Sequence, residues 1–272
     1  MSDITVITAR RRLTFIDFHE IWVYRELFWT FVTRDLKVRY KQTLIGGLWA
    51  VFQPLVTMII FSVFFGAVVK ISSDNVPYPI FSYAGLILWT YFAGALSAAS
   101  NSLVNSSNLI TKVYFPRIII PLAATLTGLV DYAVATTLLV VLFIMYHITP
   151  PVTIVFLPVI LLLTWFLASG IGLWLSAINV KYRDVVYATP FFISILLYVT
   201  PIIYPVSIAP RYHALLTLNP LTGLIEAHRA LILGNHPVDL NSLLISVIVS
   251  AIIFATGALY FRSVERYFSD II

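Results

Sequence analysis

The stretch IIIPLAATLTGLVDYAVATTLLVVLFIMY occupies positions 118–146 and carries one charged side chain, Asp131. At about 1.5 Å per residue, an α-helix of this length exceeds the roughly 30 Å of hydrocarbon in a bilayer. Lipid offers no hydrogen-bond partner to backbone amides, so a continuous apolar run of this kind predicts a transmembrane helix. The protein is therefore expected to be embedded in a membrane.

Five further apolar stretches are separated by charges, prolines and polar clusters. The six predicted spans are Leu48–Val69, Ile80–Ser100, Ile118–Tyr146, Val152–Ile178, Val185–Tyr204 and Leu243–Phe261. Their residues do not alternate between apolar and polar, which argues against a transmembrane β-barrel. The expected fold is an all-α membrane protein, with residues 46–272 forming a six-span transmembrane domain.

Composition narrows the function. The chain is 60% hydrophobic and 11% charged, and it contains no cysteine, whereas an average soluble domain has about 25% charged residues. No G-x-x-x-x-G-K-[ST] string occurs, so no ATP site is expected in this chain. The histidines show no metal-ligand spacing, and no nucleophile–base pair is evident. We expect no catalytic residue, metal or cofactor in this chain, and no nucleic-acid partner.

Lysine and arginine fall mainly in alternate loops of this topology. With the N-terminus in the cytoplasm, all but three of the 17 basic residues lie on the cytoplasmic side, as the positive-inside rule requires. The three on the outer side are Lys70, Arg211 and Arg229. Both termini are therefore expected to be cytoplasmic, with residues 1–19 forming a polar tail that shows no cleavable signal.

A segment rich in aromatic and charged residues precedes the first span. Residues 20–45 are predicted to form an amphipathic helix in the membrane interface, and Gly46 and Gly47 allow the chain to turn into the span. The cations that cluster on one face of this helix are Arg34, Lys37 and Lys41. They are interpreted either as an anchor beside anionic lipid or as part of a functional gate.

Prolines interrupt the fifth predicted span and the region after it. The interrupting residues are Pro201, Pro205 and Pro210. Residues Arg211–Gly234 then contain two apolar pieces, broken at Asn219-Pro220 and each too short to cross, which predicts re-entrant or interfacial helices on the outer side. The alternative, a seventh and an eighth span, would place three ionisable side chains of this segment in lipid.

Two features are ambiguous from composition alone. Asp131, deep in the third span, is either a pathway-lining or proton-linked group, or a structural carboxylate hydrogen-bonded to a Thr, Tyr or Asn of a neighbouring helix. The loop 102–117 is either a plain connection or a docking element, a short helix from Leu103 to Phe115 with an apolar edge and Pro116 opening the next span.

Several segments, taken in order, resemble the type-2 ABC export permeases for cell-surface polysaccharides. These are RDLKVRYKQTLIGGLW (Arg34–Trp49) with Gln53-Pro54, LITKVYFPR (Leu109–Arg117), NVKYRDV (Asn179–Val185), TPIIYP (Thr200–Pro205) and LNP (Leu218–Pro220). The second resembles the coupling helix of that family, the third its second cytoplasmic loop, and the last two its outer gate region. The resemblance covers nearly the whole chain beyond about residue 20.

This resemblance implies a homodimer in the bacterial cytoplasmic (inner) membrane, carrying two copies of a separate subunit that binds ATP and Mg²⁺. The cargo implied is a lipid-linked glycan such as O-antigen, capsule or teichoic-acid polymer. The implied ATPase-coupling residues are Leu103, Asn108, Leu109, Lys112, Phe115, Pro116 and Arg117, joined by Tyr182, Arg183 and Asp184 of the second cytoplasmic loop. Closure of the ATPase would move the Leu103–Phe115 helix and separate the protomers. Asp substitutions at Leu109 and Phe115 are expected to abolish docking but not insertion.

The resemblance also implies roles for residues at and within the membrane. Arg34, Lys37 and Lys41 would meet the phosphate of the lipid head group. The outer gate region, 205–240 with Tyr204, would include Asn219 and Pro220. Aromatic side chains could provide flat faces along which sugar rings slide, although Trp and Tyr are also enriched at the membrane interfaces of most membrane proteins. The pathway candidates are Trp49, Phe52, Trp89, Tyr91, Asp131 and Tyr198.

Two rival functions remain. One is a type-2 permease for a drug or small lipid, which a fused ATPase or a large extracellular domain would favour. The other is a channel or secondary transporter, which paired charges within the spans or inverted repeats would favour.

Overall fold

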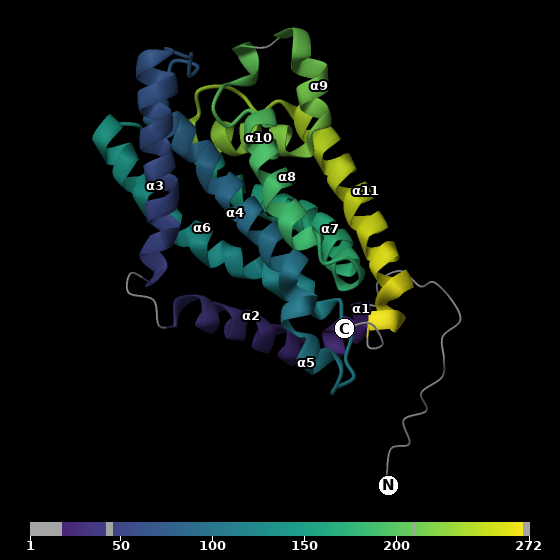
Figure 1. Ribbon diagram of the computed structural model, residues 1–272. Helices are drawn as coiled ribbons and strands as arrows, with labels where there is room; N and C mark the ends of the chain where they lie inside the picture. The colour runs from purple at the N-terminus through teal and green to yellow at the C-terminus, as the bar shows by residue number, and fades with distance from the viewer. Residues whose placement is uncertain (1–17, 42–45, 209, 269–272) are drawn as a thin grey trace.

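The computed structural model describes residues 18–41, 46–208 and 210–268, and within these ranges every regular element is a helix (Figure 1). This confirms the all-α prediction. Residues 1–17 of the predicted tail and 42–45 of the predicted interfacial helix lie outside the described residues.

Five helical stretches are long and apolar enough to cross a membrane. The first joins η1 (Gly46–Leu48), α3 (Trp49–Phe61) and the π-helix η2 (Ser62–Val68). The others are α4 (Tyr78–Asn105), α6 (Ile119–Tyr146), η3 (Val152–Phe156) with α7 (Leu157–Lys181), and α11 (Leu240–Val264) with η6 (Glu265–Tyr267). They correspond to five of the six predicted spans.

The remaining predicted span, Val185–Tyr204, is helical only over α8 (Val185–Val199). Its 15 residues extend about 22 Å, less than the thickness of the hydrocarbon core. The helix ends because the residue before a proline is forced out of the α conformation, and Thr200, which precedes Pro201, is extended with ψ 138°. The helical part of this stretch is therefore shorter than the sequence predicted.

Helix α4 lies at the centre of the bundle (Figure 1). It packs most extensively against α6 and α7, and also contacts α3, α8 and α10. Its side chains are buried on nearly all faces of its first half; Tyr83, Ile87 and Phe92 are inaccessible. In a membrane protein such a helix is shielded from lipid by its neighbours, so α4 forms the core of the bundle.

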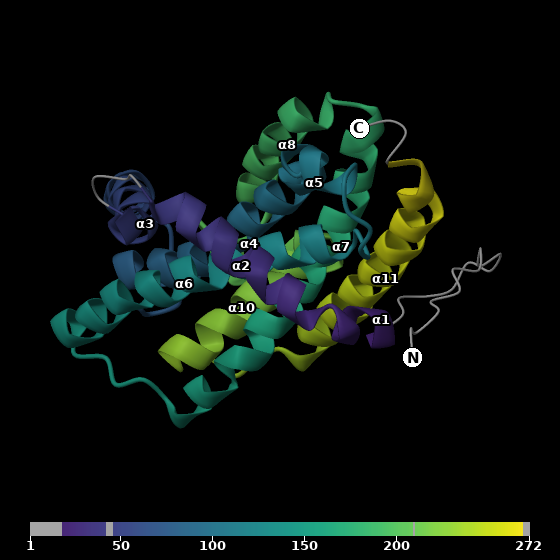
Figure 2. The same ribbon diagram turned by 90° about the horizontal axis from the view of Figure 1, so that it is seen from below.

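One end of the bundle, called here the α2 end, is crossed by the N-terminal segment (Figure 2). The predicted continuous helix is two helices, α1 (Phe18–Val23) and α2 (Arg25–Tyr40). Phe31 and Val32 of α2 are buried in an apolar cluster with residues of α6, α7 and α11. Gly46 has φ 57°, a left-handed conformation that glycine adopts without strain, at the turn from α2 toward α3.

At the opposite end, called the α9 end, the two short helices predicted before the last span are confirmed. They are α9 (His213–Leu218) and α10 (Pro220–Leu233), preceded by the single turns η4 (Val206–Ile208) and η5 (Pro210–Tyr212). Asn219 accepts a hydrogen bond from the Leu221 amide and caps α10, and Pro220 occupies its first position. Helix α10 packs against α4, α7 and α11, so it re-enters the bundle.

Candidate functional site

A groove lined by cations runs along α2. Its residues are Thr30, Thr33, Arg34, Lys37, Val38 and Lys41, and its volume is about 380 Å³. The spacing of three and four residues places Arg34, Lys37 and Lys41 on one helix face, as the sequence predicted. Arg34 forms an ion pair with Asp35 at 2.8 Å, whereas the two lysines form no ion pair within the described residues. The groove therefore presents positive charge at the α2 end.

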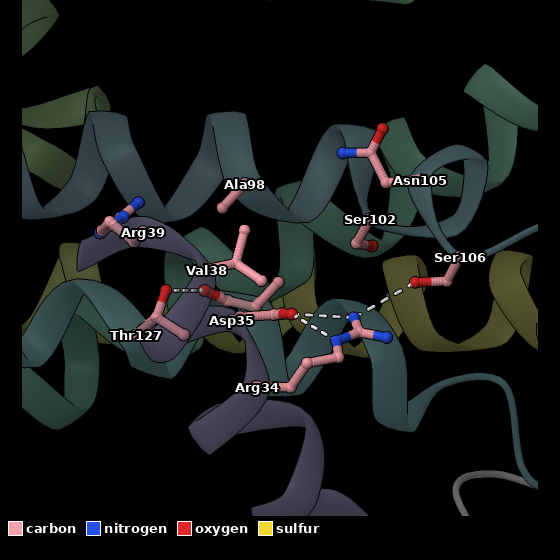
Figure 3. A pocket seen from close by; sticks show the side chains of 10 residues that line it. Arg34, Asp35, Val38, Arg39, Ala98, Ser102, Asn105, Ser106 and Thr127 are labelled. Atoms are coloured by element: carbon pink, nitrogen blue, oxygen red, sulfur yellow. Dashed lines mark hydrogen bonds and ion pairs between the residues drawn. The ribbon is translucent and has the colours of Figure 1, made fainter. Parts of the chain in front are cut away.

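A second, larger cavity of about 460 Å³ lies between α2 and the pair α4–α6 (Figure 3). Its walls are Arg34, Asp35, Val38, Arg39, Ala98, Ser102, Asn105, Ser106, Ala124 and Thr127. Arg34 donates to Ser106 Oγ at 3.4 Å across its edge. Sequence reasoning did not predict this cavity, because the α2 residues of its wall lie about 60 to 90 positions before the wall residues of α4 and α6.

Asp131 of α6 is paired with α2. Its carboxylate accepts hydrogen bonds from the Arg39 guanidinium and from the Tyr40 hydroxyl. The tyrosine is the kind of partner that the structural interpretation predicted, whereas the arginine is a partner that it did not include. Partial burial, and the hydrogen bond to Asp131, raise the pKa of Tyr40 to about 12. The pair ties the end of α2 to a span.

The predicted coupling helix, Leu103–Phe115, is wrong in extent. Leu103 belongs to α4, which runs on to Asn105, and the following α5 (Ser107–Ile110) is a single turn. Phe115 is only 3% exposed and packs against the Phe31 ring at 5.7 Å. Leu103 is buried as well, so neither side chain is accessible for contact with another subunit.

The exposed part of this loop lies between those two residues. Tyr114 is 76% exposed, and the other exposed members are Asn108, Thr111, Lys112 and Val113, while Leu109 is half-buried. Pro116 is buried, and the Arg117 amide donates to Glu265 Oε1 at 2.8 Å. The exposed residues 108 and 111–114 are called the loop tip below. Its base is fastened to α2 and to the end of α11.

The second predicted loop lies at the same end. Tyr182, Arg183 and Asp184 are all exposed, between α7 and α8. Just before them, Asn179 is buried and donates to the Ser100 carbonyl of α4 at 2.8 Å. The helix ends that carry the two loops are therefore bonded to each other.

The aromatic pathway candidates divide into two groups. Trp49 and Phe52 on α3 and Tyr198 on α8 are exposed. Trp89 and Tyr91 lie in the buried core of α4, with Tyr91 edge-on to Tyr132 at 6.3 Å between ring centroids. The prediction for Trp89 and Tyr91 is corrected, because neighbouring helices cover their faces; both lie on the helix that the bundle surrounds.

At the α9 end, Asn219 has a second contact besides its cap. Its side-chain amide donates to Thr200 Oγ1 at 3.0 Å, which joins the start of α10 to the end of α8. Tyr204 is half-buried nearby in sequence, beyond the break in α8. Pro220 contributes the fixed first turn of α10.

Arg229 is the functional-site candidate that sequence reasoning missed. The charge count registered it only as a basic residue on the outer side, but it is fully buried on α10. Its guanidinium donates to the carbonyls of Pro201 at 2.6 Å and Ile202 at 2.5 Å, and pairs with Glu226 at 3.0 Å. It also lies 3.9 Å from the centre of the Phe81 ring.

The Arg229 guanidinium supplies hydrogen-bond donors to carbonyl groups just beyond the end of α8. Proline breaks the helical hydrogen-bond ladder after Val199, leaving carbonyl groups that water cannot reach. Arg229 satisfies two of them from another helix. The signal available in the sequence was a Glu and an Arg three residues apart, at positions 226 and 229 of a mainly apolar helix, a spacing typical of an internal ion pair.

Among the described residues, no group of three or more His, Cys, Asp or Glu side chains is placed to hold a metal ion. The fold and the surfaces described above define a multi-pass integral membrane protein. Residues 26–233 match the ABC-2 type transporter family, and the chain belongs to that family.

The chain is similar along most of its length to named permeases. It is 27% identical over 255 residues to the O-antigen export system permease protein RfbA of Myxococcus xanthus, covering 92% of this chain and 97% of the relative. It is 28% identical over 241 residues to RfbA of Klebsiella pneumoniae, covering 88% and 92%. It is 25% identical over 243 residues to the polysialic acid transport protein KpsM of Escherichia coli, covering 84% and 89%. The family resemblance predicted from the motifs is confirmed, and it implies an ATP-binding partner in a transporter complex.

Proposed function

We propose that the chain is the membrane-spanning permease subunit of an ATP-driven exporter that moves a lipid-linked cell-surface polysaccharide across the bacterial cytoplasmic membrane. The observation that carries this proposal is the similarity over 84 to 92% of the chain to permeases for two different glycans, O-antigen and polysialic acid. A family member that exports a drug or small lipid would not account for the similarity to proteins named for O-antigen export and polysialic acid transport.

The proposed complex contains two copies of this chain and two copies of the ATP-binding subunit, which holds ATP and Mg²⁺. Two protomers related by a two-fold axis can form a continuous corridor between them. Trp49, Phe52 and Tyr198 are exposed and suited to line it, whereas Trp89 and Tyr91 are not. The broken end of α8, with Tyr204, Asn219 and Pro220, would form the outer gate.

The loop tip and the exposed residues 182–184 would dock onto the ATP-binding subunit in the cytoplasm. Both lie at the α2 end on helices joined by the Asn179 hydrogen bond, so movement imposed on one loop reaches both α4 and α7. Such a rigid-body coupling needs no chemistry in this chain. The cationic groove of α2, with Arg34, Lys37 and Lys41, would receive the phosphate of the lipid carrier.

The proposed function is tested by deleting the gene for this chain from its bacterial host. We expect the surface polysaccharide to disappear and its lipid-linked form to accumulate in the cytoplasmic leaflet, and an intact copy to restore export. The measurement is immunoblotting of surface glycan beside mass spectrometry of the lipid-linked pool. An unchanged surface glycan would contradict the proposal.

Docking is tested at the loop tip with Tyr114→Asp. Tyr114 is exposed, so the variant should accumulate normally in the membrane, while co-purification of the ATP-binding subunit and export both fall at least tenfold. Tyr212→Asp is the matched control for co-purification, since Tyr212 is an exposed tyrosine at the α9 end; export is not compared for it, because Tyr212 lies in the predicted outer gate region. Phe115→Asp should instead lower the amount of folded permease, because Phe115 is buried. Full co-purification with Tyr114→Asp would refute the assignment of the loop tip.

A further inference from the structure

We propose that the cavity between α2 and α4–α6 binds the first sugar of the lipid-linked glycan while the adjoining groove holds the phosphate to which that sugar is attached. This inference rests on the proposed function and adds a specificity site to it. The cavity volume, about 460 Å³, falls within the roughly 300–1,000 Å³ typical of small-ligand pockets.

The cavity and the groove adjoin. Arg34 and Val38 line both, and Lys37 and Lys41 continue the groove along the same helix. Within the cavity, the Arg34 guanidinium is held by Asp35 at 2.8 Å and by Ser106 at 3.4 Å (Figure 3). The cavity's two arginines, Arg34 and Arg39, are paired with Asp35 and Asp131, whereas Lys37 and Lys41 of the groove form no ion pair among the described residues. A ligand that spans the two spaces is therefore best matched by a negative charge in the groove and an uncharged polar group in the cavity.

The polar groups of the cavity wall fit a ligand rich in hydroxyls. Asp35 offers a carboxylate, which only accepts hydrogen bonds, and the exposed Asn105 offers an amide, which both donates and accepts. The hydroxyls of Ser102 and Thr127 donate to the Ala99 carbonyl at 2.7 Å and to the Ala124 carbonyl at 2.8 Å, so their oxygens remain available as acceptors. Neighbouring sugar hydroxyls, each a donor and an acceptor, satisfy such a mixed wall.

The rest of the wall is apolar. Val38, Ala98 and Ala124 supply small aliphatic surfaces from three different helices. A pyranose ring has one face of C–H groups that packs on such surfaces while its hydroxyls point to the polar groups. A free phosphate or an inorganic anion would leave the aliphatic wall without a partner, so the wall favours a sugar phosphate over an anion alone.

A phosphate that bears hydroxyls could also come from a membrane lipid such as phosphatidylglycerol. Its glycerol head group has only two free hydroxyls and no ring, so it would leave most of the polar wall without a partner. We therefore assign the cavity to the sugar, and the experiment must separate these two sources.

The experiment measures binding to the purified full-length chain in phosphatidylcholine nanodiscs. The probes are a short-chain polyprenyl diphosphate that carries N-acetylglucosamine, the same diphosphate without a sugar, and phosphatidylglycerol. We expect the sugar-bearing probe to bind the wild type at least tenfold more tightly than the sugar-free probe, and phosphatidylglycerol to compete with neither at equal concentration.

Two wall variants locate the sugar. Asn105→Ala removes an amide that makes no side-chain hydrogen bond among the described residues, and Thr127→Val removes a hydroxyl at nearly constant volume. Each should weaken the sugar-bearing probe by about threefold to tenfold, the range of one hydrogen bond, and leave the sugar-free probe unchanged. The matched control is Thr137→Val, an exposed threonine of α6 that donates to the Val134 carbonyl at 2.7 Å in the same way. Lys37→Ala should weaken both diphosphate probes.

Equal affinity of the wild type for the two diphosphates, or equal weakening of both by the wall variants, would overturn the cavity assignment. Competition by phosphatidylglycerol as strong as that of the sugar-bearing probe would also overturn it, in favour of a lipid. These outcomes are separable from a failure of the proposed function, which the surface glycan of the deletion strain reports independently.

Discussion

Two arginine–carboxylate pairs, one near each end of the bundle, have opposite surroundings. Arg39 and Asp131 join α2 to α6 at the α2 end, and their side chains are 33% and 29% exposed. Arg229 and Glu226 lie within α10 toward the α9 end, and the arginine is completely buried. The first pair connects two elements at a surface, whereas the second neutralises a charge that is already inside the protein.

The difference in burial gives the two pairs different roles: the exposed pair links two helices, and the buried pair is needed for the packing of the bundle. Because α2 is expected to lie in the membrane interface, water should reach the end of α2 and the Arg39–Asp131 pair, and a hydrated pair gains little over its separated ions. The Arg229 guanidinium cannot return to water unless the bundle opens, and it also satisfies the backbone of the α8 break. Removing one partner of a buried pair leaves the other uncompensated, which costs far more than the pair itself contributes.

The largest effect is expected for Arg229→Met. The variant leaves Glu226 and the carbonyls of Pro201 and Ile202 without their partner, so the free energy of unfolding should fall by about 3–5 kcal/mol. The measurement is denaturant unfolding of the protein in detergent, and export should fall in parallel. Arg211→Met is the control, because Arg211 is exposed at the same end. A loss below about 1 kcal/mol would erase the distinction between the two pairs.

A smaller effect is expected when the space beside Arg229 is filled. A Cβ added at Gly85 of α4 would lie 2.5 Å from Arg229 Nη2, too close for the guanidinium to keep its place. Gly85→Ala should destabilise by about 1–3 kcal/mol, the range for overpacking a core. Gly94→Ala on the same helix has no atom within 4 Å of the added carbon, so it should be neutral or slightly stabilising. Equal behaviour of the two variants in thermal unfolding would show that Arg229 adapts freely.

The smallest effect is expected at the exposed pair. A double-mutant cycle with Arg39→Ala and Asp131→Ala should give a coupling energy of about 0.2–1 kcal/mol, as for other partly exposed pairs. The cycle is measured by the same unfolding assay in detergent. A coupling energy above about 2 kcal/mol would place this pair in the same class as the buried one.

The sequence predicted those features that depend on local pattern. Long apolar runs fixed five spans, Gly46 marked the turn into the first span, and Asn219-Pro220 marked the start of α10. These hold because chain length, backbone freedom and capping act over a few neighbouring residues.

The errors have a different physical origin. The burial of Arg229 was missed because a charge count registers sign and position along the chain, not burial. The Arg39 partner of Asp131 is 92 positions away, and Phe115 has the same apolar character whether it faces a partner or Phe31. Each of these depends on which helices meet, which one sequence does not state.

The hydrogen bonds from Arg229 to the segment after α8 also constrain the order in which the protein can assemble. The partners of Arg229 outside α10 come from two parts of the chain that precede it, namely α4, with Phe81, and the segment just after α8, with Pro201 and Ile202. In a membrane protein built from the N-terminus onward, α10 can settle at depth only after these parts are in place. A chain that stops before α10 would leave the Pro201 and Ile202 carbonyls without the guanidinium, so the packing of the α8 break depends on a residue that is made after it.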